Sequence, residues 1–209
     1  MVKMGFILPH LSVENMGNDM KKHQTGQPQV TVLVGPTAVG KGTVMAALRQ
    51  EHPEISYSVS ATTRLPRPGE VDGVHYFFVT RERFKEMVDA GMMLEWAEVH
   101  GLNYYGTPRE PVEAAIAAGR PVLIEVDLAG ARQIRASMPQ ARHVFLAPPS
   151  FEVLVERLTG RGTESEQEQA RRLETALTEM AAQDEFDQVI VNDTVDNCVR
   201  ALAEFMGLD

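Results

Sequence analysis

The most regular feature of the sequence is a repeated change from a short apolar run to a segment with helical spacing. Short apolar runs of this kind are typical of strands that are buried on both faces of a sheet. Amphipathic segments follow most of them, as expected for helices that cover such a sheet. This order of elements predicts an α/β fold in which a parallel sheet is flanked by helices. The expected strands occupy residues 30–34, 55–60, 121–126, 143–147 and 187–193.

The stretch from about residue 59 to residue 107 departs from this order, because strand-like patterns dominate it. Since it lies between two segments that carry the strand and helix alternation, we expect it to form an inserted subdomain of mixed α+β structure. Its expected elements are strands at 74–79 and 93–99, a helix that Thr80 caps and Gly91 ends, a turn or short strand at 103–106 and an irregular loop at 61–70.

Residues typical of helix N-caps predict two further helix starts. The segment Thr107-Pro108-Arg109-Glu110 has the form of a capping box, with proline at the first helical position. Asp127 follows an apolar run and precedes helical spacing, so its carboxylate is a candidate N-cap. We therefore expect helices to begin at both positions.

The segment between the first expected strand and its helix is the clearest candidate for chemistry. Glycines allow a chain to turn so that successive backbone N–H groups point inward, and the helix N-terminus adds further donors. Lys41 would place a full positive charge on the β- and γ-phosphates of a nucleotide. The context of strand, glycine loop and helix predicts a P-loop and a nucleoside-triphosphate site. The segment reads Gly35-Pro36-Thr37-Ala38-Val39-Gly40-Lys41-Gly42-Thr43.

One position of this loop departs from the common pattern, in which Ser or Thr follows the lysine and binds Mg²⁺. Gly42 occupies that position, and Thr43 comes one residue later. One residue corresponds to about 100° of helix rotation. Thr43 is therefore the candidate magnesium ligand, but its direction differs from that of the common serine.

Charged residues outside the loop allow two interpretations each. Arg64 and Arg67 stand three apart in the loop at 61–70, where they could clamp an anion or face solvent, and the loop alone favours solvent. Glu125 and Asp127 share one face at the carboxyl end of the strand at 121–126, where ligands bind in open α/β sheets. Buried carboxylates there are costly unless they meet a cation or donors. N-capping would explain Asp127 but not Glu125.

A glycine-hinged basic turn around Arg161 and a polar helix from Glu166 with Arg171 and Arg172 resemble a lid over phosphates. A solvated helix face is an equally good explanation of the same composition.

Length, composition and charge narrow the function classes. The 209 residues suit one domain with inserted parts, and 44% hydrophobic with 23% charged residues are ordinary values for a globular protein. A net charge of −9 argues against general binding to nucleic acid or anionic membranes. The single cysteine, Cys198, excludes an internal disulfide and suits a reducing cytoplasm. No apolar run approaches the roughly 18 residues of a membrane helix, and residues 1–28 read as a flexible extension.

Taken together, the motifs from about Val30 onward resemble guanylate kinase, the nucleoside monophosphate kinase that moves the γ-phosphoryl of ATP to GMP. Each motif is modest alone, but their order and spacing are specific. Gly42, Ala61 and Thr107 stand where serines are common in that family, and Thr107 keeps the hydroxyl. Besides the P-loop, the motifs are S-A-T-T-R-L-P-R-P-G-E from Ser60, L-E-W from Leu94, Y-Y-G-T from Tyr104, E-V-D from Glu125, A-P-P-S from Ala147, G-R-G-T-E from Gly160 and V-I-V-N-D from Val189.

The resemblance implies a division of the chain into working parts. It implies a core of residues 29–58, 108–156 and 173–209, a GMP-binding subdomain of residues 59–107 and a lid of residues 157–172. The implied substrates are ATP, with Mg²⁺ as cofactor, and GMP, while use of dGMP and the oligomeric state are left open. The implied GMP phosphate ligands are Ser60, Arg64, Arg67, Tyr76 and Tyr105, and the implied readers of guanine are Glu95 and Thr107 with Glu125 or Asp127.

On the ATP side, the resemblance implies that Asn192 lies near adenine, beside the P-loop residues. The resemblance also implies that Arg157, Arg161 and Arg172 correspond to the lid arginines of the family. Phosphoryl transfer needs positioning and cations more than covalent help, so no general base is assigned. The cations expected to act in catalysis are Lys41, Arg64, Arg157, Arg161 and Arg172.

Two other functions share parts of this pattern. Guanylate-kinase-like modules in scaffold proteins bind partners without catalysis, but they typically have degraded P-loops, whereas Lys41 and its glycines are present here. A sister kinase for another acceptor would lack the guanine readers. A carboxylate at Glu95 can accept from guanine N1–H and N2–H₂, and a hydroxyl at Thr107 can donate to O6. The enzyme interpretation is therefore favoured.

Overall fold

A five-stranded sheet in which all neighbouring strands are parallel forms the centre of the molecule. The computed structural model describes residues 30–99, 101–159 and 166–208. The strands are arranged in the order β2-β7-β1-β8-β9, which confirms the expected parallel α/β architecture. Their bounds are β1 Val30–Val34, β2 Ser56–Tyr57, β7 Val122–Glu125, β8 Arg142–Ala147 and β9 Gln188–Val191.

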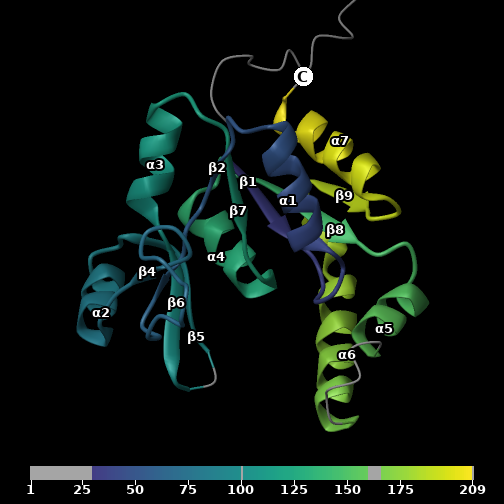
Figure 1. Cartoon of the computed structure of the whole chain (residues 1–209), viewed down its shortest axis with the longest axis horizontal. Helices are drawn as coiled ribbons and strands as arrows, with labels where there is room; N and C mark the ends of the chain where they lie inside the picture. The colour runs from purple at the N-terminus through teal and green to yellow at the C-terminus, as the bar shows by residue number, and fades with distance from the viewer. Residues whose placement is uncertain (1–29, 100, 160–165, 209) are drawn as a thin grey trace, which may run out of the picture.

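Helices cover both faces of this sheet (Figure 1). Helices α1 (Lys41–Glu51) and α7 (Val195–Met206) pack on one face, where Leu33 joins Leu48 and Leu202 in a single core cluster. Helices α3 (Arg109–Ala117) and α4 (Leu128–Ser137) pack on the other, where Val32 meets Ile134. Because side chains alternate between the faces of a strand, burial of both faces explains why four of the five residues of β1 are apolar.

A second sheet of four strands contains both parallel and antiparallel pairs, in the order β4-β3-β6-β5. Helix α2 (Arg81–Asp89) packs on it through Phe84, which lies in one cluster with Ala61 and Met93. The expected insertion of mixed α+β structure is therefore confirmed. The strands are β3 Ala61–Thr62, β4 Phe77–Phe78, β5 Met93–Val99 and β6 Asn103–Pro108.

Three local predictions in this part of the chain were wrong. Only Phe77–Phe78 of the run at 74–79 forms a strand, because the preceding residues turn through Gly73, whose φ is +73°, and Asp72 accepts a hydrogen bond from the Phe78 N–H at 2.8 Å. The loop at 61–70 is not wholly irregular, since Ala61–Thr62 pairs with both neighbouring strands.

The third wrong prediction is the capping box at Thr107. This residue is a strand residue of β6 paired with Glu95, and the helix cap is Pro108, whose side chain makes no capping hydrogen bond. The other expected caps are confirmed. The Thr80 side chain accepts from the Arg83 N–H at 3.1 Å, and the Asp127 carboxylate accepts from the Gly130 N–H at 2.7 Å.

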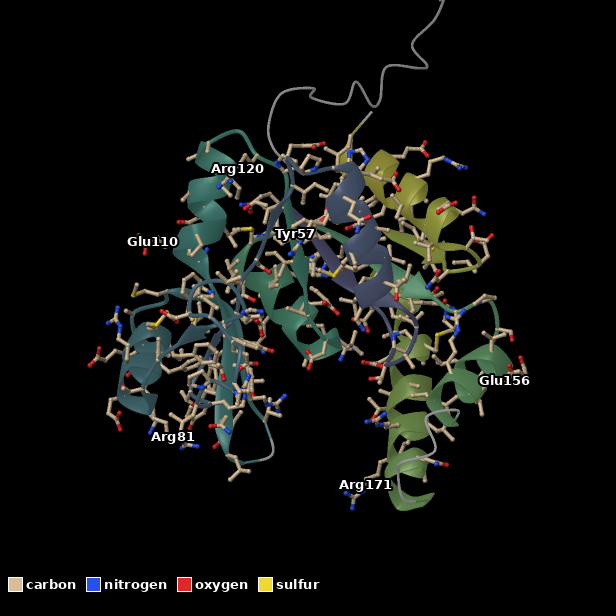
Figure 2. All side chains as sticks on the ribbon, viewed as in Figure 1. Tyr57, Arg81, Glu110, Arg120, Glu156 and Arg171 are labelled. Carbon is tan, nitrogen blue, oxygen red and sulfur yellow. The ribbon has the colours of Figure 1, made fainter. Side chains whose placement is uncertain are left out.

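Helices α5 (Phe151–Thr159) and α6 (Glu166–Ala181) pack together through Leu154, Leu158 and Ala176, and a 3₁₀ turn, η1 (Gln183–Glu185), follows. In Figure 1 this pair and the second sheet extend from the same end of the core, on opposite sides of the view. Figure 2 labels Arg81 beside the second sheet and Arg171 on α6, so basic side chains occur on both extending parts. Within the described residues, no helix is long and apolar enough to span a membrane.

The polar side chain of His143 is enclosed in the core of the parallel sheet. His143, on β8, is fully buried, and neither ring nitrogen has a hydrogen-bond partner among the described residues. Burial lowers the pKa of the His143 imidazole to about 4, the positive charge of Arg135 acts in the same direction, and the carboxylate of Asp187 opposes both. The ring is therefore neutral at pH 7, packed 6.4 Å from the Phe186 ring.

Candidate active site

The P-loop connects β1 to α1, and two of its glycines are required by close approaches. Gly40 has φ +107°, and a Cβ atom there would lie 2.6 Å from the side-chain nitrogen of Asn192. A Cβ atom on Gly35 would lie 2.5 Å from the carbonyl oxygen of Leu146, because the loop passes directly over β8. The glycine spacing of the loop therefore reflects the backbone conformation and its contacts with the sheet.

The carbonyl of Val39 at the centre of the loop accepts two side-chain hydrogen bonds. Asn192 donates from Nδ2 at 2.7 Å, and Arg157 donates from Nη1 at 3.0 Å. Asn192 is itself buried, and the thiol of Cys198 donates to its Oδ1 at 3.3 Å. Cys198 is thus a buried packing residue whose thiol contacts both Asn192 and the Val191 carbonyl. The end of β9 and helix α5 are both tied to the loop.

A cavity of about 720 Å³ lies over the loop at the carboxyl end of the parallel strands, where open α/β sheets bind ligands. Lys41 lies in its wall, with its ammonium group donating to the Gly35 carbonyl at 2.6 Å. Thr43 lies in the same wall despite its shifted position. The predicted residues in the wall are Pro36, Thr37, Ala38, Gly40, Lys41, Gly42, Thr43, Glu125, Arg157 and Asn192. By contrast, Val39 turns its side chain into the core.

The two acidic residues at the carboxyl end of β7 do not form the buried pair that their spacing suggested. Glu125 and Asp127 are both exposed, so the expected cost of burying them does not arise. Glu125 lines the cavity over the P-loop, whereas Asp127 lines a neighbouring cavity of about 550 Å³ between α4 and α6. The difference arises because Asp127 has left the strand and caps α4.

Helix α6 contributes an acidic residue that sequence reasoning missed. Glu179 is buried, and its carboxylate lies at the P-loop, close enough for the Thr37 N–H and the Lys41 charge to act on it. Burial raises the pKa of the Glu179 carboxyl, while the nearby Lys41 charge and the Thr37 N–H oppose that change. Because most residues of α6 are polar, its composition did not indicate that Glu179 is buried. The spacing of Leu173, Ala176 and Met180 marks the packed face on which it lies.

On the second sheet, several of the residues expected to bind a phosphate lie together. The Arg64 guanidinium forms two hydrogen bonds to the Glu70 carboxylate, at 2.9 and 2.8 Å, and lies 5.3 Å from the Tyr76 ring centroid. The Tyr76 and Tyr105 rings pack edge to face at 6.0 Å. The backbone N–H of Arg67 donates to Glu70 at 2.7 Å, while its own side chain is exposed.

Glu70 is the acidic member of this cluster that sequence reasoning did not single out. The Arg64 guanidinium and the Arg67 N–H lower the pKa of the Glu70 carboxyl to about 2, so it carries a full negative charge at neutral pH. Ser60 lies half-buried just before β3, and its carbonyl accepts from the Phe77 N–H at 2.9 Å.

Glu95 and Thr107 face each other across the β5–β6 pair. The Thr107 hydroxyl donates to the Glu95 Oε1 at 2.7 Å, and both side chains are buried. Burial raises the pKa of the Glu95 carboxyl and the Asp127 charge adds to this, whereas the Thr107 hydrogen bond lowers it. Gly130 lies beside the second carboxylate oxygen, since a Cβ atom there would be 3.2 Å from Oε2.

The expected lid arginines are only partly described. Arg157 is at the P-loop, Arg172 lies half-buried on α6, and Arg161 lies outside the described residues, as does the N-terminal extension of residues 1–28. The predicted site residues therefore form two clusters. One lies at the P-loop and the other lies on the second sheet.

Comparison with known proteins shows which family the chain belongs to. A family model described as guanylate kinase matches residues 27–208. The guanylate kinase of Corynebacterium jeikeium is 58% identical over 179 residues, which cover 85% of this chain and 95% of that protein. That of Rhodococcus jostii is 61% identical over 168 residues, or 80% and 81% of the two chains.

The same family is found among solved structures. The crystal structure of guanylate kinase from Anaplasma phagocytophilum matches with a TM-score of 0.66 and 31% identity, covering 87% of this chain and 85% of that one. The family model spans most of the chain, and the relatives match over most of their own length. The resemblance predicted from the motifs is confirmed, and the chain belongs to the guanylate kinase family.

Proposed function

We propose that this protein transfers the γ-phosphoryl group of ATP to GMP, giving ADP and GDP. The proposal rests on the combination, in this chain, of two features. One is a complete P-loop with its cavity, and the other is a buried carboxylate–hydroxyl pair on the second sheet. A P-loop alone would support any nucleoside-triphosphate enzyme. The Glu95–Thr107 pair supplies the reason to choose guanine.

On the ATP side, the residues around the cavity would bind and orient the triphosphate. The backbone N–H groups of the loop and the Lys41 ammonium, which lies in the cavity wall, would bind the β- and γ-phosphates. Arg157 is a second cation at the same loop, and charge developing on the transferred group is stabilised by such cations. Asn192 supports the loop from below through the Val39 carbonyl, so we assign it a supporting role in ATP binding.

On the GMP side, Arg64, Tyr76 and Tyr105 would bind the phosphate together with Ser60 and Arg67. The two parallel hydrogen bonds from Arg64 to Glu70 show that its guanidinium is oriented to bind an anionic group through both nitrogens. A GMP phosphate on this fork would take the place of the Glu70 carboxylate.

The guanine base would exchange hydrogen bonds with the Glu95–Thr107 pair. A hydroxyl has one proton, and that of Thr107 is donated to Glu95. Donation to guanine O6 therefore requires the hydroxyl to release Glu95, whose carboxylate then accepts from N1–H and N2–H₂. Adenine presents an acceptor at N1, so it would leave Glu95 buried without a donor, and such mismatches discriminate strongly between substrates.

The residues around the P-loop cavity also fit Mg²⁺, which prefers oxygen ligands and is often held by one or two protein groups plus substrate phosphates. The Thr43 hydroxyl and the Glu125 carboxylate face the same cavity. The described part of the chain contains no group of three or more His, Cys, Asp or Glu side chains that could hold a metal ion. Bound there, Mg²⁺ would neutralise phosphate charge.

The test is to measure ADP formation from Mg²⁺-ATP with GMP, dGMP, AMP, CMP or UMP as the only acceptor. Turnover with guanine nucleotides alone is expected, and a Lys41→Met variant that remains folded should be inactive. Turnover with another acceptor would indicate a sister kinase. Binding of GMP without turnover, by protein shown to be folded, would favour a non-catalytic guanylate-kinase-like binding module.

A further inference from the structure

The outer edge of β5, the strand that carries Glu95, is bound by side chains of α4 rather than by another strand. Gln133 Oε1 accepts from the Trp96 backbone N–H at 3.1 Å, and Gln133 Nε2 donates to the Trp96 carbonyl at 3.0 Å. A single amide side chain thereby satisfies both backbone groups of one residue, as a neighbouring strand would do. Among the strands that the structure describes, β5 is the last of its sheet, and Gln133 makes at this point the hydrogen bonds that a neighbouring strand would make.

The same face of α4 makes two further contacts with this strand. Ser137 donates from its hydroxyl to the Leu94 carbonyl at 2.6 Å. Gly130, one turn before Gln133, lies against the Glu95 carboxylate and leaves room for it, as a Cβ atom would approach Oε2 to 3.2 Å. Positions 130, 133 and 137 have the three- and four-residue spacing of one helix face. The backbone on both sides of Glu95 is therefore bound by α4.

This arrangement connects the guanine reader to the core. α4 begins directly after β7 of the parallel sheet and packs on that sheet through Ile134, whereas Glu95 belongs to the inserted second sheet. A carboxylate must be placed to within a fraction of an ångström to accept two hydrogen bonds from one base. Free edge strands lack that restraint.

We propose that Gln133 is a positioning residue for guanine recognition, which holds the β5 backbone against α4 so that Glu95 meets the base. The inference rests on the proposed function, since it assigns Glu95 to the base. It goes further by predicting that selectivity for guanine depends on Gln133, whose side chain binds the backbone of Trp96, the residue after Glu95. Gln133 acts on GMP binding and not on ATP binding.

The test uses Gln133→Met, which keeps the length of the side chain and removes both hydrogen bonds. The matched control is Gln50→Met, the same change at an exposed position of α1. Calorimetric titration would measure the affinities for GMP and for an unreactive ATP analogue separately. Trp96 is the chain's single tryptophan, so its fluorescence reports whether β5 has moved.

Gln133→Met is expected to weaken GMP binding about 10-fold, because two hydrogen bonds that fix the reader are lost, while affinity for the ATP analogue changes less than about twofold. In a Glu95→Gln background the same substitution should weaken GMP binding less than about threefold, since residues that act through one another are not additive. If Gln133→Met acted through a general loss of structure, it would instead weaken GMP binding by the same factor in the parent and in the Glu95→Gln background.

The inference would be overturned by unchanged GMP affinity in Gln133→Met, by equal losses for both ligands, or by equal losses with and without Glu95. These results leave the proposed function intact, because the parent protein would still bind GMP. If the parent itself binds no GMP, the proposed function fails, and the inference fails with it.

Discussion

Replacing His143 with leucine should remove much of the acid sensitivity of the folded protein. The imidazole is enclosed in the core of the parallel sheet, where its pKa is about 4, compared with 6.5 for an ordinary histidine. The unfolded state therefore binds more protons than the folded state in the window between these values. Stability falls as the pH decreases from about 6.5 and the loss is complete below about 4.

The size of this effect follows from the two pKa values. Linkage gives a loss of about 2 kcal/mol from this one group between pH 7 and pH 5, and a limit of about 3.4 kcal/mol at lower pH. At pH 7 the change in stability should be small, within about 1 kcal/mol, because the substitution removes two unpaired polar atoms but also some packing against Phe186.

The assay is urea unfolding followed by circular dichroism at pH 7 and pH 5. The difference in unfolding free energy between the two pH values should be about 2 kcal/mol smaller in His143→Leu than in the parent. His75→Leu, at an exposed position, retains His143 and should behave like the parent. If the pH dependence of His143→Leu equals that of the parent, a neutral buried imidazole is not the source of the acid sensitivity.

Three further predictions concern the site. Glu95→Gln should raise KM for GMP at least 10-fold, roughly the loss of one charged hydrogen bond, with KM for ATP little changed; equal losses in steady-state assays would remove Glu95 from base recognition. Because burial raises the Glu95 pKa, KM for GMP in the parent should rise as the pH falls. Steady-state kinetics at several pH values should show no such rise of KM in Glu95→Gln. Gly40→Ala should cost about 1–3 kcal/mol of stability and weaken ATP binding, because alanine is strained at φ +107° and its Cβ would meet Asn192. The control is Gly119→Ala, at a position with positive φ but open surroundings. Equal ATP affinity in the two variants would contradict the argument that the Cβ crowds Asn192.

Features that depend on neighbouring residues in the sequence were predicted well. The apolar run of β1 and the glycine spacing after it identify the P-loop, because the tight turn and the helix start are local properties. The caps at Thr80 and Asp127 also follow from a few adjacent residues.

Features that depend on distant pairing could not be predicted in the same way. Thr107 has a capping pattern, but pairing with Glu95 across the sheet draws it into β6. Gln133 and Glu179 look like ordinary polar residues of surface helices, and only the packing of α4 on β5 and of α6 on the P-loop gives them partners. The resemblance to a family predicted the site residues but not these supporting ones.

The two donors on the Val39 carbonyl have a consequence for the timing of catalysis. A carbonyl oxygen has two lone pairs, and here one is taken by buried Asn192 and the other by exposed Arg157. If Arg157 moves to an incoming phosphate, as its proposed role requires, the oxygen keeps its bond to Asn192 and no buried acceptor is left unpaired. Under that proposal the departure of Arg157 costs little free energy and is reversible. The loop would then release and recapture this arginine without loosening its own backbone.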